Sequence, residues 1–213
     1  MSKRYLGLLI LTGLLLPVAA KADTEAWDFT TVTGQGNGGT SYALGTLFTP
    51  TVNIVVDSLG YYDATNVDST SQPSLMTQSH RVSLFDVTTG GTLVANTTVT
   101  NAGTLVGHFI YESVGPVELF STDEYELVGV TNTTDFYTNA ANVSGFTLSA
   151  DIVLDGYNKN PGVSAGYDPL NTASAQSFGA DLGFEPVPEP SSLLLLGTGL
   201  AGLAGMLKRK LMA

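Results

Sequence analysis

The 213-residue chain contains no cysteine, and this absence excludes disulfide cross-links, thiolate nucleophiles and cysteine metal sites. A domain without disulfides must be held together by its hydrophobic core. Once the two terminal segments described below are set aside, about 168 residues remain. That length is enough for one domain with a sizeable core and too short to argue for two.

Positive charge is scarce in the middle of the chain. Of the eight Lys and Arg residues, three precede Asp23 and three follow Leu207, which leaves only Arg81 and Lys159 between them. All nineteen carboxylates lie between residues 23 and 189, so this region carries a net charge of −17, compared with −11 for the whole chain. Such a surface repels phosphate backbones, and we expect no nucleic-acid partner. It also keeps an exported protein dispersed and attracts cations.

Histidine is nearly absent as well, and this limits the catalytic possibilities. Gly162-x-Ser164-x-Gly166 matches the nucleophile elbow of α/β-hydrolases, which requires a strand–turn–helix context and a triad histidine later in the chain. Both histidines, His80 and His108, precede Ser164. We expect each to be a surface or edge residue, although either could in principle be a ligand or a base. No hydrolase triad is predicted.

A glycine-rich segment near the N-terminus matches another functional motif by its letters alone. Gly34-x-Gly36-x-x-Gly39 has the spacing of a dinucleotide fingerprint, which works only where the third glycine opens a helix. The residues that follow, 40–46, are strand-like. We therefore expect a glycine loop and no nucleotide cofactor.

The first 22 residues have the layout of a secretory signal peptide. Lys3-Arg4 form a positive region, residues 6–16 form an apolar core, and Pro17 breaks it. Ala20-Lys21-Ala22 then supplies small residues on either side of a larger one, which predicts cleavage after Ala22. A buried amphipathic helix would need a polar face, which this segment lacks.

The last 27 residues have three parts. Val187-Pro188-Glu189-Pro190 comes first, a run of apolar residues and glycines occupies 191–207, and Lys208-Arg209-Lys210 follows. Seventeen residues at about 1.5 Å each form a helix of roughly 26 Å, just long enough to cross a hydrocarbon core. The three cations are costly to desolvate, so they would stop transfer and stay on the cytoplasmic side.

This order of motif, helix and basic cluster resembles the PEP-CTERM sorting tail of Gram-negative bacteria. The resemblance implies processing by an exosortase, a membrane cysteine transpeptidase-like enzyme, in cells that make exopolysaccharide. Pro188 and Pro190 should hold the chain extended and present Glu189 just outside the bilayer. The resemblance covers only the tail, and it implies where the protein goes more than what it does there.

Between the two terminal segments the hydrophobic pattern has a period of two. Strands are predicted at residues 27–33, 42–48, 52–63, 81–87, 92–100, 106–113, 117–120, 124–130 and 146–154. The third strand should bend near Ser58 or Gly60, and residues 64–79 should form a long loop. Short strands about 8–12 residues apart with Gly, Asn and Asp between them predict an all-β fold, a single β-sandwich over residues 23–186.

Several of these segments resemble a bacterial surface domain of uncharacterised function. They are residues 60–63, 80–86, 91–95, 116–119 and 125–129. The resemblance implies a jelly-roll sandwich akin to carbohydrate-binding modules and spans roughly residues 45–130. It departs from the family at Thr122-Asp123-Glu124, where the family has a glycine before the next tyrosine. Because the family's activity is unknown, the resemblance transfers no site.

Acidic and aromatic residues supply the remaining candidates. A structural Ca²⁺ could take oxygen ligands from Asp57, Asp63 and Asp68, or from Asp155, Asn158 and Asn160, but neither set matches a ligand-spacing motif. Asp123, Glu124 and Glu126 could include a glycosidase acid pair, although we expect solvated edge charges instead. Possible stacking platforms for sugar rings are Tyr61, Tyr62, Tyr137, Tyr157 and Tyr167.

Together these observations predict an exported protein of the cell surface or exopolysaccharide matrix, with a structural or binding role and no enzymatic activity. The alternatives are a carbohydrate-binding module and, further away, a glycoside-active enzyme. A flat row of exposed aromatic side chains would favour the binding module. A cleft with two converging carboxylates would favour the enzyme. Expected partners are the exosortase, the inner membrane transiently, and exopolysaccharide.

Overall fold

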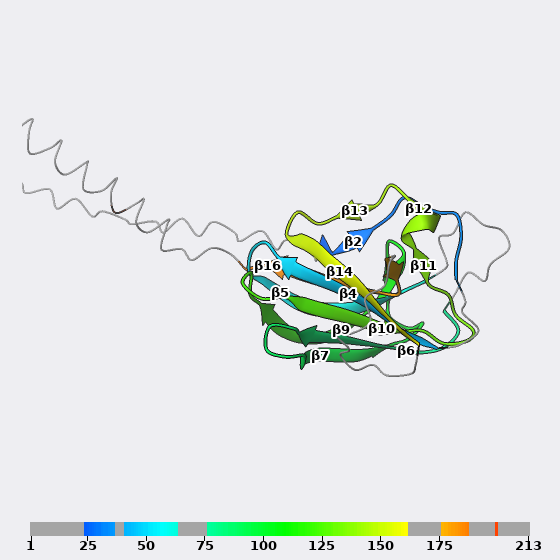
Figure 1. The fold of residues 1–213 in the computed structure, drawn as a ribbon, viewed down its shortest axis with the longest axis horizontal. Coiled ribbons are helices and arrows are strands. Elements are labelled where there is room, and N and C mark those ends of the chain that lie inside the picture. The colour runs from blue at the N-terminus through cyan, green and yellow to red at the C-terminus, as the bar shows by residue number, and fades with distance from the viewer. Residues whose placement is uncertain (1–23, 37–40, 64–75, 162–175, 188–198, 200–213) are drawn as a thin grey trace, which may run out of the picture.

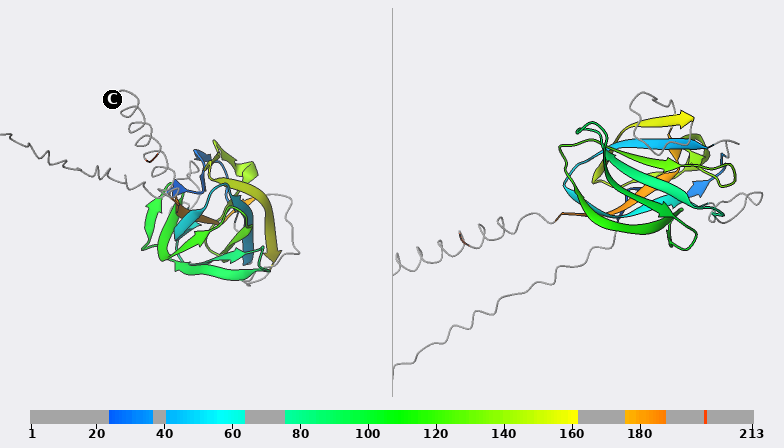
Figure 2. Two further views of the ribbon diagram at one scale, coloured as in Figure 1. Left: turned by 90° about the vertical axis from the view of Figure 1, so that its left-hand side faces the viewer. Right: turned by 90° about the horizontal axis from the view of Figure 1, so that it is seen from below.

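A computed structural model describes residues 24–36, 41–63, 76–161, 176–187 and the single residue Gly199 (Figure 1). Within these residues the chain forms sixteen strands and one short 3-10 turn, η2 (Ala140–Asn142). Most of the strands belong to two five-stranded antiparallel sheets that face each other (Figure 2). The prediction of an all-β sandwich is therefore confirmed, whereas the narrower jelly-roll assignment stays a prediction.

The two sheets are named here sheet I and sheet II. In spatial order, sheet I contains β1 (Thr24–Glu25), β16 (Ala180–Pro186), β5 (Ile54–Tyr62), β9 (Phe109–Leu119) and β8 (Thr104–Val106). Sheet II contains β14 (Ile152–Pro161), β4 (Tyr42–Pro50), β10 (Tyr125–Val130), β6 (His80–Asp86) and β7 (Thr92–Val99). Consecutive strands such as β4 and β5, or β9 and β10, lie in opposite sheets.

Three pairs of two-residue strands lie outside the two sheets. They are β2 (Trp27–Asp28) with β13 (Thr147–Leu148), β3 (Thr31–Val32) with β12 (Val143–Ser144), and β11 (Thr138–Asn139) with β15 (Ser177–Phe178). The continuous strand predicted at 27–33 is therefore wrong. Its backbone hydrogen-bonds in short stretches to a distant segment, residues 142–148, for example from Thr30 N to Ser144 O. The Trp27 indole donates to the Ala180 carbonyl.

The core between the sheets is formed by the inward positions of the long strands. The largest fully buried side chains of the described domain are Trp27, Tyr61, Tyr62, Tyr125, Phe48, Phe109, Phe178 and Phe184. Tyr61 points between the sheets, whereas Tyr62 and its register partner Phe109 lie on the other face of sheet I, where Phe29 covers them. Fully burying an apolar side chain contributes about 1.5–3 kcal/mol. A core of this size can hold the fold without disulfides.

In strand β5 the alternation of inward and outward side chains shifts by one residue near Ser58, where the sequence predicted a bend. Ile54 and Val56 point into the core, and so do Leu59 and Tyr61. The register with both β16 and β9 skips Asp57. This β-bulge inserts one extra residue, which turns Ser58 and Gly60 to the outer face of sheet I.

The predicted strands between residues 42 and 130 largely match the observed ones. The segments 106–113 and 117–120 are the main exception, because they contribute to β8 and to one long strand, β9. The predicted strand 146–154 instead covers β13 and the start of β14. β16 was not predicted, although it lies second in sheet I between β1 and β5. Of the predicted loop 64–79, residues 64–75 lie outside the described part, and residues 76–79 contain no strand.

Candidate functional site

The predicted sorting tail begins at Val187, directly after β16, which is the last strand of the domain along the chain. Pro186 pairs with Ile54, and the Val187 N–H donates to the Asn53 carbonyl at 2.8 Å. The N-terminal end of the described domain is close to this point, because Thr24 pairs with Phe184. The proposed cleavage residues Ala20 and Ala22, the segment Pro188-Glu189-Pro190 and the basic cluster Lys208-Arg209-Lys210 lie outside the described residues.

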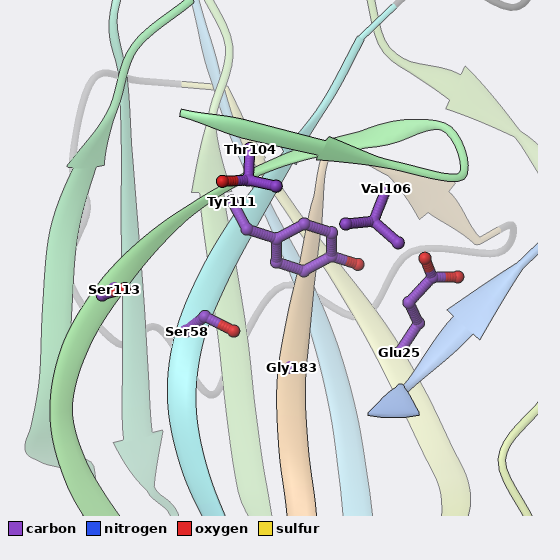
Figure 3. Close-up of a pocket in the computed structure, with 7 residues that line it drawn as sticks. All are labelled: Glu25, Ser58, Thr104, Val106, Tyr111, Ser113 and Gly183. Atoms are coloured by element: carbon purple, nitrogen blue, oxygen red, sulfur yellow. The ribbon is translucent and has the colours of Figure 1, made fainter. Parts of the chain in front are cut away.

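A pocket of about 160 Å³ lies on the outer face of sheet I (Figure 3). All five strands of the sheet contribute to its lining, which consists of Glu25, Ser58, Thr104, Val106, Tyr111, Ser113 and Gly183. Most of these residues are register partners: Glu25 with Gly183, Gly183 with Ser58, Ser58 with Ser113, and Thr104 with Tyr111. Paired residues on neighbouring strands point to the same side of a sheet, so their side chains converge there.

The floor of the pocket depends on the bulge at Asp57 and on two glycines. The bulge turns Ser58 outward, over Gly183, where an added Cβ would lie 2.2 Å from the Ser58 hydroxyl oxygen. The Tyr111 ring covers Gly60, where a Cβ would lie 2.7 Å from ring carbon Cε1. Side chains at either glycine would collide with residues that line the pocket. Glycine at such positions allows close approach of a neighbouring group.

A buried carboxyl group lies beneath the wall of the pocket. The Tyr111 hydroxyl donates to Asp181 Oδ2 at 2.6 Å, and the Leu182 N–H donates to Oδ1 at 2.7 Å. Burial raises the pKa of Asp181 well above its usual range, against the opposing effect of these hydrogen bonds. Burial also raises the pKa of Tyr111, and the charge of Asp181 adds to that shift.

A second acidic residue, Glu25, lines the pocket itself. Burial raises the pKa of Glu25 at the pocket rim, the neighbouring Asp28 carboxylate adds to the shift, and His108 opposes it. Between residues 24 and 187 the only Lys and Arg residues are Arg81 in β6 and Lys159 in β14. Both strands belong to sheet II, so no Lys or Arg of the described domain lies in the sheet that forms the pocket.

His108 is a buried residue paired with a carboxylate, and the expectation of a surface or edge histidine is wrong for it. Its Nδ1 lies 2.8 Å from Asp28 Oδ1, and its ring packs against Phe29 at a centroid distance of 4.8 Å. The His108 carbonyl also accepts from the Asp63 N–H. These contacts connect the first residues of the domain to the β8–β9 turn.

His80 is also buried, contrary to the same expectation. Its Nδ1 lies 2.8 Å from the Val130 carbonyl oxygen, its Nε2 lies 2.9 Å from Asp135 Oδ2, and its ring stacks on Tyr61. Burial raises the pKa of Asp135, but hydrogen bonds from Thr77, His80 and Gln78 outweigh it and lower the pKa to about 2. This network fastens residues 76–80 and 130–135 together at the end of the sandwich away from Val187.

Three of the five candidate stacking tyrosines lie inside the protein. Tyr61 is fully buried, Tyr62 is 1% exposed and Tyr137 is 7% exposed, so the interpretation of these three as sugar platforms is wrong. Tyr157 is partly exposed on β14, and Tyr167 lies outside the described residues. The large exposed aromatic side chains of the described domain are Phe120 and Phe146, which do not form a row on one sheet.

The first calcium hypothesis is not supported by the positions of its residues. Asp57 lies at the bulge within β5, whereas Asp63 lies six residues further along and its Oδ1 accepts from the Met76 N–H. Six strand residues span about 20 Å, too far for both to bind one ion. Asp68 lies outside the described residues.

The second calcium set is tested only at Asp155, whose Oδ2 accepts from the Thr49 hydroxyl at 2.7 Å. The side chains of Asn158 and Asn160 lie outside the described part of the structure. Among the residues that are described, no three His, Asp or Glu side chains converge in a way that could hold a metal ion.

The acidic residues near β10 differ in their exposure to solvent. Asp123 and Glu124 are partly exposed in the turn before β10, as expected. Glu126 is only 1% exposed, and β10 is the central strand of sheet II. Its interpretation as a solvated edge charge is therefore wrong.

The two motif look-alikes remain without functional support. Gly36 pairs with Tyr137 in an isolated bridge, and strand β4 follows at Tyr42. The described flanks of this glycine segment are therefore strand-like, as expected. Gly39 and the segment containing Ser164 lie outside the described residues.

Sequence reasoning missed the pocket. Glu25, Ser58, Tyr111 and Gly183 are far apart in the chain, and none of them belongs to a recognisable motif. The available indication was the alternation in 180–186, where Ala180, Leu182 and Phe184 are apolar and the residues between them are polar or glycine. Recognising that strand would have placed Asp181 and Gly183 on one outer face.

A family model for the PEP-CTERM protein-sorting motif matches residues 186–210. No curated protein matches the chain. The motif implies an exosortase as the processing partner and export through the membrane to the cell surface of a Gram-negative bacterium. The prediction of a sorting tail is confirmed. No helix in the described part of the chain has the length and apolarity to cross a membrane, and the predicted span 191–207 lies outside that part except for Gly199.

Proposed function

We propose that the protein is a component of the cell surface or exopolysaccharide matrix whose β-sandwich binds polysaccharide once its tail has been processed. The junction between the sandwich and the tail carries this proposal. The matched motif begins at residue 186, the last residue of β16, and the Val187 N–H makes a further hydrogen bond to Asn53. Cleavage at or beside Pro188-Glu189-Pro190 would therefore release the sandwich with all of its strands in place.

The pocket on sheet I supports a binding role over a purely structural one. Its lining combines hydroxyl groups, a carboxylate and an aromatic ring, which is a combination suited to a hydroxyl-rich ligand. The described residues give no flat aromatic surface for a long glycan chain, so the proposal assigns binding to the pocket. A structural component without a ligand is the alternative.

The proposal includes no enzymatic activity. His80 and His108 are each engaged with a buried or partly buried carboxylate and stabilise the fold. At the pocket, Glu25 lies at the rim, whereas Asp181 is fully buried and bonded to Tyr111. A glycosidase would need two carboxyl groups that both reach the substrate.

The sorting half of the proposal is tested by replacing Pro188, Glu189 and Pro190 with alanine. We expect the wild-type surface protein to lack Lys208-Arg209-Lys210 by intact-mass analysis, and the variant to stay in the inner membrane with its tail attached. Ser191→Ala with Ser192→Ala is the matched control and should be processed normally. Wild-type surface protein that still carries the basic cluster would show that the tail is an ordinary anchor.

The binding half is tested by co-sedimentation of the wild-type protein with exopolysaccharide from the producing cells. The expected result is saturable binding that soluble polysaccharide competes away. A protein that reaches the surface but does not sediment with the polysaccharide would favour the purely structural role.

A further inference from the structure

We propose that the pocket on the outer face of sheet I binds a single amine-bearing sugar unit, a hexosamine with a free amino group. The inference rests on the proposed function, because the sugar would be a unit of the polysaccharide that the protein binds. It goes further by assigning the site, the size of the bound unit and its charge.

The size of the pocket limits the ligand to one small ring. The volume of the pocket is about 160 Å³. Pockets for drug-sized ligands are larger, at about 300–1,000 Å³. The site therefore accommodates one sugar unit at a chain end or a branch, and it does not follow an extended oligosaccharide.

The lining matches the surface of a sugar ring. Ser58, Thr104 and Ser113 supply hydroxyl groups that can donate and accept hydrogen bonds, as ring hydroxyls require. Val106 and the Tyr111 ring lie beside each other and provide an apolar surface for C–H groups (Figure 3). The hydroxyl end of Tyr111 and the Glu25 carboxylate lie on the same side of the pocket as Val106 (Figure 3).

The charge of the site selects among sugars. Glu25 is the carboxylate that lines the pocket, and Asp28 is close enough to Glu25 to add to its negative potential. Lys and Arg of the described domain are confined to sheet II. A protonated amine gains attraction at such a site, whereas a uronic acid or phosphate is repelled.

The pocket is built into the backbone of the sheet. The register shift at Asp57 turns Ser58 outward, and Gly60 and Gly183 leave the space that the Tyr111 ring and the Ser58 hydroxyl occupy. Bulges are common beside binding sites because they redirect a side chain. The Tyr111–Asp181 hydrogen bond then holds the ring in one orientation.

The test is a titration of the full-length chain in detergent micelles at neutral pH with four sugars. They are glucose and three sugars that each differ from it at one carbon, namely glucosamine and N-acetylglucosamine at C2 and glucuronic acid at C6. We expect glucosamine to bind at least about tenfold more tightly than the two neutral sugars, and glucuronic acid not to bind measurably.

Two variants locate the interaction. Glu25→Gln should reduce glucosamine affinity to that of glucose, while Glu118→Gln, the same change at an exposed position of β9 in the same sheet, should leave it unchanged. Val106→Lys places a cation at the pocket rim, so it should weaken the binding of glucosamine and allow glucuronic acid to bind. Val106 is 45% exposed on edge strand β8, where lysine is well tolerated, so this variant should fold even if Glu25→Gln does not.

The outcomes separate this inference from the proposed function. The site is wrong if glucosamine affinity survives both pocket substitutions, if glucuronic acid binds as well as glucosamine, or if the folded wild-type chain binds none of the four sugars. Co-sedimentation with polysaccharide that is unaffected by the pocket variants would overturn the pocket as the binding site and leave polysaccharide binding by the protein standing. Glucosamine binding in the pocket without co-sedimentation would support the site and overturn polysaccharide binding by the protein.

Discussion

The Tyr111 hydroxyl donates a hydrogen bond of 2.6 Å to Oδ2 of Asp181, although β5 lies between their two strands. Gly60 stands between them in the register, paired with both residues. Because Gly60 has no side chain, the Tyr111 ring can lie across β5 and reach the carboxyl group. The wall of the pocket is thereby fixed to the centre of sheet I.

Loss of this hydrogen bond should destabilise the protein. Tyr111→Phe leaves Oδ2 of the buried Asp181 without its donor, and we expect the free energy of unfolding to fall by about 1–3 kcal/mol. Tyr157→Phe removes a hydroxyl from a partly exposed position on β14 and should change it by less than about 0.5 kcal/mol. Chemical denaturation of both variants measures this. Equal losses would show that the Tyr111–Asp181 bond has no special role.

Asp181 should make stability decline as pH rises. Because burial raises its pKa in the folded chain, the unfolded chain loses this proton first. Its contribution is full below the unfolded pKa of about 3.9 and is lost as pH rises from there toward the raised folded pKa. Asp181→Asn resembles the protonated form, so the stability of this variant relative to wild type should increase as pH rises above about 4.

Denaturation curves at several pH values measure this difference. Asp155→Asn makes the same change on β14, outside the pocket, and its difference from wild type should show no comparable increase. A relative stability of Asp181→Asn that is independent of pH would contradict a raised pKa for Asp181.

Asp135 should have the opposite effect on the pH dependence, so that stability falls as the solution becomes more acidic. Its pKa is lowered to about 2 in the folded chain, so its contribution is present above the unfolded pKa of about 3.9 and is lost as pH falls through about 2. Asp135→Asn keeps the shape but replaces one acceptor oxygen with a donor facing its partners Thr77, Gln78 and His80. We expect Asp135→Asn to lower the free energy of unfolding by about 1–3 kcal/mol at neutral pH. The difference in stability between wild type and this variant should become smaller as the pH is lowered. A penalty that stays constant down to about pH 2 would argue against an ionised Asp135.

The purified full-length chain should not hydrolyse glycosides or esters. The described domain contains no complete triad, and the pocket exposes a single carboxylate, Glu25. Assays with chromogenic glycosides and esters check this expectation. Turnover that disappears on Glu25→Gln, Glu124→Gln or Ser164→Ala would identify the protein as an enzyme.

The predicted strands were most accurate where the local pattern and the tertiary environment agree. β6 was predicted almost to the residue, because Val82 and Leu84 alternate with polar or outward-facing residues and the strand is paired on both sides, with β10 and β7. β16 was overlooked because glycine and aspartate interrupt its apolar positions. Those same interruptions, Asp181 and Gly183, are the residues that the site requires on its outer face.

Burial of charged residues was the least predictable property. His80, His108 and Glu126 read as exposed residues in an acidic chain, and all three are buried. Their burial depends on partners from distant segments, such as Asp135 for His80 and Asp28 for His108. Nothing in the local sequence around either histidine specifies such a partner.

The sequence by itself determined the features that are local in the chain. The sorting tail, the predicted export signal, the absence of disulfides, the acidic character and the all-β class all follow from composition or from patterns shorter than about 30 residues. Only the tertiary structure decided the site. Glu25, Ser58, Tyr111 and Gly183 meet because of strand order and register, and one extra residue at Asp57 determines which side chains face outward. Because side chains alternate with a period of two, a shift of one residue reverses the face of every residue beyond it, and register is set by long-range pairing that no local pattern records.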